Sequence, residues 1–154
     1  MNFSKKSLGQ NFLIDPNIKR KIINLVKINN NNIVEIGPGK GSLTDEILKK
    51  EPKSLILIEK DEVLYNQLKE KYKSKKNIKI YNKDILKFNI EKKIKKKTII
   101  FGNLPYNISS QILIKMIKFK QWPPKYSSLI FMFQKELAER IYGKYGSSSY
   151  GRLS

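Results

Sequence analysis

The segment Asn103-Leu104-Pro105-Tyr106 carries residue types suited to holding a flat base that bears an amine. It follows the apolar run 98–100, which reads as a buried strand, so it falls where that strand ends. In an open parallel α/β sheet, ligands bind in the crevice beyond the carboxyl ends of the strands. There, the Asn103 side chain and the backbone carbonyl of Leu104 or Pro105 could accept the two N–H bonds of the amine, while the Tyr106 ring stacks on the base. The alternative is a strand that ends in a proline turn, with Tyr106 as a packing residue.

A glycine loop forms a second constellation, in which Gly37, Gly39 and Gly41 alternate with other residues. The loop joins the first predicted strand to a helix, where glycines allow a ligand to approach closely and the helix N-terminus offers free N–H groups. A dinucleotide fingerprint needs a further glycine at position 42, but Ser42 stands there. The spacing therefore suits a nucleoside without a pyrophosphate, such as S-adenosylmethionine, better than a dinucleotide. An ordinary tight turn is the alternative for this loop taken alone.

Two acidic residues follow the next two predicted strands. Glu59 ends the second strand, where a carboxylate can accept both hydroxyls of a ribose. Asp84 follows the third strand and could accept a hydrogen bond from the amine of adenine. Both residues could instead be helix caps. Because Gly37, Glu59 and Asp84 follow three successive strands in order, we predict that they form one cofactor site.

The composition excludes several kinds of chemistry. The 154 residues include no cysteine and no histidine, which removes thiolate chemistry, Cys-based zinc sites and the commonest general base. We therefore predict no metal site, and catalysis that works without a base titrating near neutrality. No apolar run is long enough to span a bilayer, and residues 1–10 are polar and basic, so we expect a cytoplasmic protein with no membrane partner.

The net charge predicts a polyanionic partner. The chain has 32 Lys and Arg residues against 13 Asp and Glu, a formal charge of +19, which favours nucleic acid. Almost all the basic residues are lysines, as a composition bias would produce, but such a bias does not explain why carboxylates are so few. The lysines that could contact RNA are Lys5, Lys6 and the clusters at 69–76 and 92–97.

Strands alternate with helices along the whole chain, which predicts an α/β domain with a mostly parallel sheet and helices on both faces. The helical pattern begins after the Asp15-Pro16 cap and continues through Ile18, Ile22 and Val26. Residues 84–97 are ambiguous and read as a short helical turn followed by a lysine-rich loop. The predicted strands are 33–36, 55–58, 78–81, 99–101 and 129–133, and the later helices contain 43–48, 64–72, 112–117 and 137–142.

Five segments together resemble the KsgA-type ribosomal RNA adenine dimethyltransferases. They are 5–13, 35–44, 103–109, 131–136 and 150–154. The resemblance implies a Rossmann-like class I methyltransferase. It further implies that methyl groups pass from S-adenosylmethionine to N6 of two adjacent adenines near the 3′ end of small-subunit rRNA. The implied partners are that RNA and the ribosomal particle.

The resemblance also assigns roles to individual positions. It implies a reactive site at 103–106, with Phe131 holding the second face of the target adenine, although apolar neighbours make Phe131 an equally natural core residue of the fifth strand. The cofactor site that it implies consists of Asn11, Leu13, Gly37, Glu59, Asp84 and Asn103.

Two alternatives stay open. The macrolide-resistance methyltransferases of large-subunit rRNA typically read Gly-Ser-Gly in the loop and Asn-Ile-Pro-Tyr at the strand end, where this chain has Pro38 and Leu104. A non-catalytic RNA-binding assembly factor on the same fold is the second alternative, against which the intact Asn103 and Gly37 argue.

The resemblance carries an expectation about completeness. The family fold closes its sheet with two further strands and adds a small helical domain, neither of which fits after Ser154. We therefore expect residues 1–154 to be the methyltransferase domain of a longer protein that is monomeric at full length. The apolar strand 129–133 would then form an exposed edge, through which the 154-residue chain should associate or precipitate. We also expect the 154-residue chain alone to methylate ribosomal particles poorly or not at all.

Overall fold

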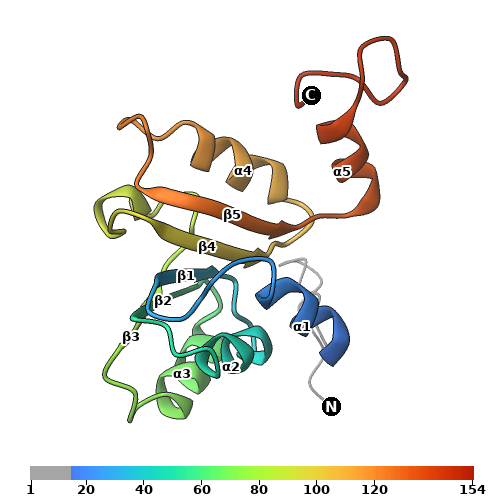
Figure 1. The fold of residues 1–154 in the computed structure, drawn as a ribbon. Helices are drawn as coiled ribbons and strands as arrows, with labels where there is room; N and C mark the ends of the chain where they lie inside the picture. Colours follow the sequence, from blue (N-terminus) through green and yellow to red (C-terminus); the bar gives the residue numbers. More distant parts are fainter. Residues whose placement is uncertain (1–14) are drawn as a thin grey trace.

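Five parallel strands form the central sheet of the computed structural model, which describes residues 15–154 (Figure 1). The strand order is β3-β2-β1-β4-β5. The chain runs outward from β1 to β3 and then crosses to β4 on the other side of β1. The sheet therefore has a topological switch point between β1 and β4. The strands are β1 (Asn32–Ile36), β2 (Ser54–Glu59), β3 (Ile78–Asn82), β4 (Thr98–Asn103) and β5 (Tyr126–Met132).

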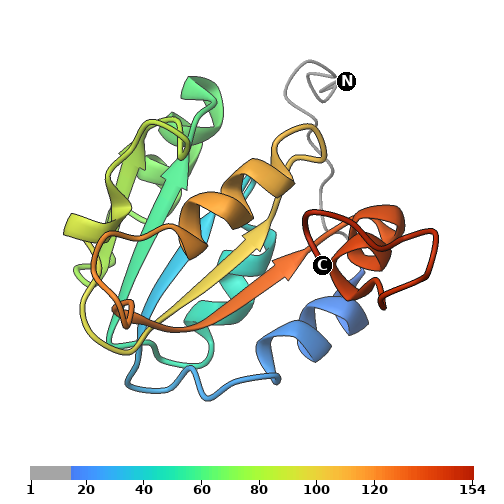
Figure 2. The same ribbon diagram turned by 90° about the horizontal axis from the view of Figure 1, so that it is seen from above.

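Helices cover both faces of this sheet (Figures 1 and 2). The helices α1 (Pro16–Ile23), α2 (Ser42–Leu48) and α3 (Glu62–Lys71) pack on one face. The opposite face is covered by α4 (Ser109–Ile117) and the 3₁₀-helix η2 (Ile90–Lys92), while α5 (Lys135–Tyr142) follows β5. The predicted α/β class and Rossmann-like arrangement are confirmed, and all five described strands are parallel.

Side chains that alternate between the two faces of the sheet form two apolar cores, one on each face. Ile33 and Phe101 point to the α1–α3 side, whereas Val34 and Ile100 point to the α4 side, and all four are at most 1% exposed. The side chains of a strand alternate between faces, so a strand buried on both faces reads as a continuous apolar run. This is why β1, β2 and β4 were visible in the sequence as short apolar runs.

The first helix begins as predicted but ends earlier. The Asp15 carboxylate accepts hydrogen bonds from the backbone N–H of Asn17 at 2.7 Å and of Ile18 at 3.4 Å, as a capping residue does. The helix stops at Ile23, whereas the apolar spacing suggested that it continues through Val26. Val26 still packs against the core from the turn that follows. Val26 is therefore apolar because it packs against the core, which made the helical pattern in the sequence extend beyond the end of the helix.

The last strand lies at an edge of the sheet. β5 pairs with β4, and within residues 15–154 no strand pairs with its other side. Its side chains from Leu129 to Met132 are half-buried, and Phe133 falls just beyond the strand although the sequence placed it inside. The expected association through this edge stays a prediction.

Candidate nucleoside-binding and reactive site

The glycine loop leaves β1 at the switch point. Gly37, Gly39 and Gly41 all have positive φ, at 67°, 58° and 81°, a region that other residues rarely adopt. The Gly37 N–H donates to the Ile58 carbonyl of β2 at 3.0 Å. A side chain at Gly37 would also point toward the backbone oxygen of Asn103, 3.7 Å from the position of its Cβ. The loop thus lies against the ends of both β2 and β4.

Gly41 is fixed from outside the loop by Tyr72. A Cβ at Gly41 would overlap the Tyr72 hydroxyl, which lies 2.7 Å from the Asp45 carboxylate and 3.2 Å from the Gly41 carbonyl. Burial raises the pKa of Tyr72, which therefore stays a hydrogen-bond donor. The alternating glycine spacing thus has two structural reasons, backbone conformation at all three positions and close packing at Gly41.

Glu59 joins the glycine loop to the end of β2. Its carboxylate is 6% exposed and accepts hydrogen bonds from the N–H of Gly39 at 3.1 Å and of Asp61 at 2.9 Å. Burial raises the pKa of Glu59 above its usual value. Each carboxylate oxygen can accept a further hydrogen bond, so the predicted role toward two ribose hydroxyls is compatible with these contacts. The helix-cap alternative is wrong for Glu59, because Asp61 caps α3.

Asp84 lies across the crevice from Glu59. One oxygen accepts from the Leu86 N–H at 2.9 Å, and the other pairs with the Lys60 ammonium at 2.9 Å. The hydrogen bond from Lys60 lowers the pKa of Asp84. Asp84 therefore does cap the turn that follows it, as the alternative held, and its second oxygen faces a cation that the sequence analysis missed.

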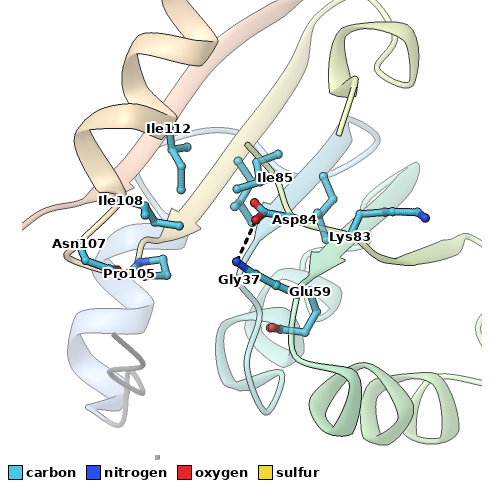
Figure 3. A pocket seen from close by; sticks show the side chains of 12 residues that line it. Gly37, Glu59, Lys83, Asp84, Ile85, Pro105, Asn107, Ile108 and Ile112 are labelled. Carbon is cyan, nitrogen blue, oxygen red and sulfur yellow. Dashed lines mark ion pairs between the residues drawn. The ribbon is translucent and has the colours of Figure 1, made fainter. Parts of the chain in front are cut away.

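One pocket unites three of the predicted cofactor residues (Figure 3). Glu59 and Asp84 contribute carboxylates to its lining, Gly37 contributes open backbone, and isoleucines from β1, β2 and α4 form apolar walls. The lining residues are Ile36, Gly37, Ile58, Glu59, Lys60, Lys83, Asp84, Ile85, Pro105, Asn107, Ile108 and Ile112. Several that the sequence analysis missed, such as Lys60 and Ile85, directly follow residues that it found.

The predicted reactive segment 103–106 lies next to this pocket, but only one of its four residues lines it. Pro105 is a lining residue, and Asn103 ends β4 with its carbonyl beside Gly37. Leu104 is 2% exposed and its side chain belongs to the α4-side core, so only its backbone is available to a ligand. Tyr106 is 43% exposed and stands outside the lining. Asn103, Leu104 and Pro105 thus occupy the predicted strand end, with Tyr106 open to solvent.

Phe131 has a place in the core as well as near the reactive segment. It pairs in register with Gly102 of β4, the residue before Asn103. Its ring meets that of Phe133 edge-to-face at 6.1 Å between centroids, and it packs against the core on the α4 side. The structure thus supports the packing interpretation of Phe131, and its role toward a base stays a prediction.

Some predicted residues lie outside the described part of the chain. Asn11 and Leu13 of the cofactor site, and Lys5 and Lys6 of the proposed RNA contacts, belong to residues 1–14. Among residues 15–154, no cluster of three or more potential metal ligands is present, and no helix has the length and apolarity to cross a membrane.

The chemistry of the pocket fits the nucleoside part of S-adenosylmethionine. A ribose needs acceptors for two hydroxyls, and Glu59 presents them at the loop. An adenine ring needs flat apolar walls and an acceptor for its amine, and the pocket offers Ile58, Ile85 and the Asp84 carboxylate. Positive-φ glycines keep side chains away from the ligand path. Fold and site together define a Rossmann-like class I methyltransferase domain.

The family is shown by sequence. The sequence model of the ribosomal RNA adenine dimethylase family matches residues 1–154, and the chain belongs to this family. It is 50% identical over 151 residues to the "Ribosomal RNA small subunit methyltransferase A" of Pelagibacter ubique, covering 98% of this chain and 57% of that protein. The chain spans about half the length of the curated relatives it matches.

Solved structures agree with this assignment. A dimethyladenosine transferase from Plasmodium falciparum superposes with a TM-score of 0.78 at 34% identity, covering 93% of this chain and 50% of that one. The 23S rRNA methyltransferase ErmE superposes with a TM-score of 0.74 at 27% identity, covering 88% and 53%. The names of the relatives point to different RNAs, the small-subunit rRNA for the Pelagibacter ubique relative and 23S rRNA for ErmE.

Proposed function

We propose that this chain carries the catalytic site of an rRNA adenine dimethyltransferase. It would transfer methyl groups from S-adenosylmethionine to N6 of two adjacent adenines near the 3′ end of small-subunit rRNA, on the ribosomal particle in the cytoplasm. The observation that carries the proposal is the meeting of two features at one switch point, the two-carboxylate pocket and the end of β4 at Asn103. The names of the relatives support the choice of substrate.

The proposed cofactor contacts divide between the strand ends. Glu59 would hold the ribose hydroxyls and Asp84 the adenine amine, with Gly37 giving room for close approach. Asn11, Leu13 and Asn103 complete the set that the family resemblance implies. S-adenosylmethionine supplies an electrophilic methyl group when bound.

The proposed role of Asn103 is to orient the target amine. The amine lone pair of adenine is delocalised into the ring, which makes N6 a poor nucleophile. If the Asn103 side chain and the carbonyl of Leu104 or Pro105 accept its two hydrogens, the nitrogen becomes pyramidal and its lone pair points toward the methyl donor. The proton leaves only after nitrogen has become cationic, so no base is required beforehand. Such positioning is worth about 7–11 kcal/mol in well-oriented reactions.

The test is a radiolabel assay with S-adenosylmethionine and unmethylated small-subunit particles, performed on the longer protein that the sequence leads us to expect. We expect Asn103→Ala to abolish methyl transfer, because the change removes the group that orients the amine. The control is Asn66→Ala, the same substitution at an exposed position of α3. Near-normal turnover in the Asn103 variant would contradict the proposed mechanism.

The large-subunit enzymes are a second candidate, because the ErmE structure shares the fold with a TM-score of 0.74. Large-subunit RNA and poly-A therefore belong in the same assay. Label in small-subunit particles alone supports the proposal, label in large-subunit RNA favours the second candidate, and label in neither indicates a non-catalytic factor.

A further inference from the structure

Positive charge is concentrated in one part of the molecule. Residues 85–127 contain ten lysines and a single carboxylate, Glu91. Residues 42–71, which include α2 and α3, contain six lysines and seven carboxylates. A composition bias toward lysine would act on both ranges alike. The local excess of nine positive charges, nearly half of the net charge of +19, therefore belongs specifically to the α4 face and to the segments that lead into β4 and β5.

The single carboxylate of this region holds a loop in place. Both oxygens of Glu91 accept backbone N–H groups of the loop between α4 and β5, from Gln121 at 2.7 Å and from Lys120 at 3.2 Å. The Lys125 ammonium lies 3.4 Å from the Glu91 carbonyl. Figures 1 and 2 show this loop beside the segment that leads from η2 to β4. Glu91 thus fixes the loop to the lysine-rich segment.

The anchored loop presents Trp122 to solvent. Trp122 is 69% exposed, and it is the only tryptophan of the chain. Lysine-lined hollows flank the loop on two sides. One is lined by Lys96, Lys97 and Lys125 with Pro123 and Pro124, and the other by Lys87, Lys115, Lys118 and Lys120.

We propose that Trp122 and the surrounding lysines form a second binding site, for single-stranded RNA. One base stacks on the indole ring, and the phosphates on either side of it contact the lysines of the two hollows. Stacking on an aromatic ring beside a basic groove is how proteins bind single strands without reading their sequence. The lysine excess favours a polyanion as the partner. The exposed indole ring favours a polyanion that carries bases, so RNA fits this site better than an acidic protein does.

The proposed RNA site around Trp122 and the proposed methyl-transfer site lie at different ends of the sheet. Lys97 directly precedes β4 and Asn103 ends it, so the two sites lie at opposite ends of one strand, about 20 Å apart for six residues. α4 covers the same interval from Ser109 to Ile117. The inference rests on the proposed action on RNA, and it gives the enzyme a hold on its substrate outside the adenine pocket.

The sole tryptophan makes the proposal testable by fluorescence. Titration with a short single-stranded RNA should quench Trp122, whereas inorganic polyphosphate, which has no bases, should bind with far less quenching. Trp122→Ala should weaken RNA binding about tenfold, and Trp122→Phe, which keeps a stacking ring, should restore most of the affinity.

Paired lysine variants test the electrostatic half of the site. Lys96→Gln with Lys120→Gln should lower the steepness of the log–log salt dependence by about 1.4, since each phosphate contact contributes about 0.7 for single strands. The matched control is Lys50→Gln with Lys53→Gln, two exposed lysines of the charge-balanced range outside both lysine clusters, which should leave the slope unchanged.

The outcomes distinguish this site from the proposed activity. RNA that binds without quenching Trp122 and with equal affinity for Trp122→Ala would overturn the site and leave the activity standing. Quenching by an acidic peptide but not by RNA would overturn it as well. A protein that binds RNA through Trp122 but methylates no RNA would support the site and contradict the proposed function.

Discussion

Glu59 and Asp84 line the same pocket, yet their pKa values are shifted in opposite directions. Burial raises the pKa of Glu59, although two backbone N–H groups partly offset the cost. The Lys60 ammonium lowers the pKa of Asp84 at the more open side of the pocket. Glu59 is thus held by two backbone N–H groups, whereas Asp84 is held by one backbone N–H and by the flexible Lys60 side chain. A ligand that contacts both would meet one rigid and one adjustable acceptor.

Removal of the Glu59 carboxylate should weaken cofactor binding. We expect Glu59→Ala to cost about 1–3 kcal/mol of S-adenosylmethionine affinity by calorimetry, the range for hydrogen bonds to charged groups. Glu62→Ala, at an exposed position of α3, is the control. An analogue without ribose hydroxyls should bind both the wild type and the Glu59 variant equally weakly. Equal affinities of the wild type and the variant for S-adenosylmethionine itself would remove Glu59 from the site.

Tyr106 offers a separate test of base binding. It is 43% exposed, so its removal should perturb the core little. Tyr106→Ala should weaken the hold on the target base by about 1–3 kcal/mol if the ring stacks on it, and Tyr106→Phe should not. The KM for RNA reports this effect. Equal KM values for the Ala and Phe variants would indicate that Tyr106 is only a surface residue.

Between elements, Glu35 connects β1 to α2. Its carboxylate is 2% exposed and accepts a hydrogen bond from the Thr44 hydroxyl at 2.6 Å. Burial raises the pKa of Glu35 to about 7 from 4.5. The folded protein therefore holds this proton more tightly than the unfolded chain does. The resulting stability is fully present below pH 4.5 and is lost as the pH rises to about 7.

Glu35→Gln should remove this pH dependence. Between pH 4.5 and 8 we expect the wild type to lose roughly 3 kcal/mol of unfolding free energy relative to the variant, at 1.36 kcal/mol per pKa unit. Denaturant unfolding of both proteins at several pH values measures the difference. Glu62→Gln, on the exposed face of α3, should leave the wild-type pH profile unchanged. Parallel profiles for the wild type and Glu35→Gln would show that Glu35 does not titrate in this range.

Gly41 tests the packing between the glycine loop and α3. Gly41→Ala should lower stability by about 2–5 kcal/mol, because it combines a left-handed backbone with overlap against Tyr72. Gly146 also has positive φ, at 83°, but a Cβ there would meet nothing within 4 Å. Gly146→Ala should therefore cost only the backbone part, about 1–2 kcal/mol. Equal losses of unfolding free energy in the two variants would contradict the role of Tyr72.

The sequence could predict what depends on local pattern. Apolar runs identified the strands, and glycine spacing identified the loop, because each reflects burial or backbone conformation at its own position. The Lys60–Asp84 pair was not predictable, because it depends on the distance between the ends of β2 and β3. The packing of Phe131 against Phe133 likewise depends on where β5 ends. Contacts between elements require the register of the sheet, which no single segment encodes.

At the scale of the whole molecule, charge is distributed unevenly between the two helical layers that cover the sheet. The α2 and α3 range is balanced, whereas residues 85–127 on the α4 side carry ten lysines against one carboxylate, nearly half of the net charge of +19. A field of one sign on one face orients an approaching polyanion before contact. The same face leads along α4 to the end of β4, where the reactive segment lies. RNA binding should therefore use many weak contacts on one side rather than a few strong ones.

This distribution predicts a steep salt dependence of RNA binding. Each phosphate contact contributes about −0.7 to the log–log slope for single strands, so four or more contacts give a slope of roughly −3 or steeper. Affinity for a single-stranded RNA should be measured from low to moderate salt, with S-adenosylmethionine affinity as an internal control that changes little. The lysines at 92–97 should contribute more than those at 69–76, because the first group lies in the carboxylate-poor range. A flat salt response would mean that the charge of +19 is composition alone.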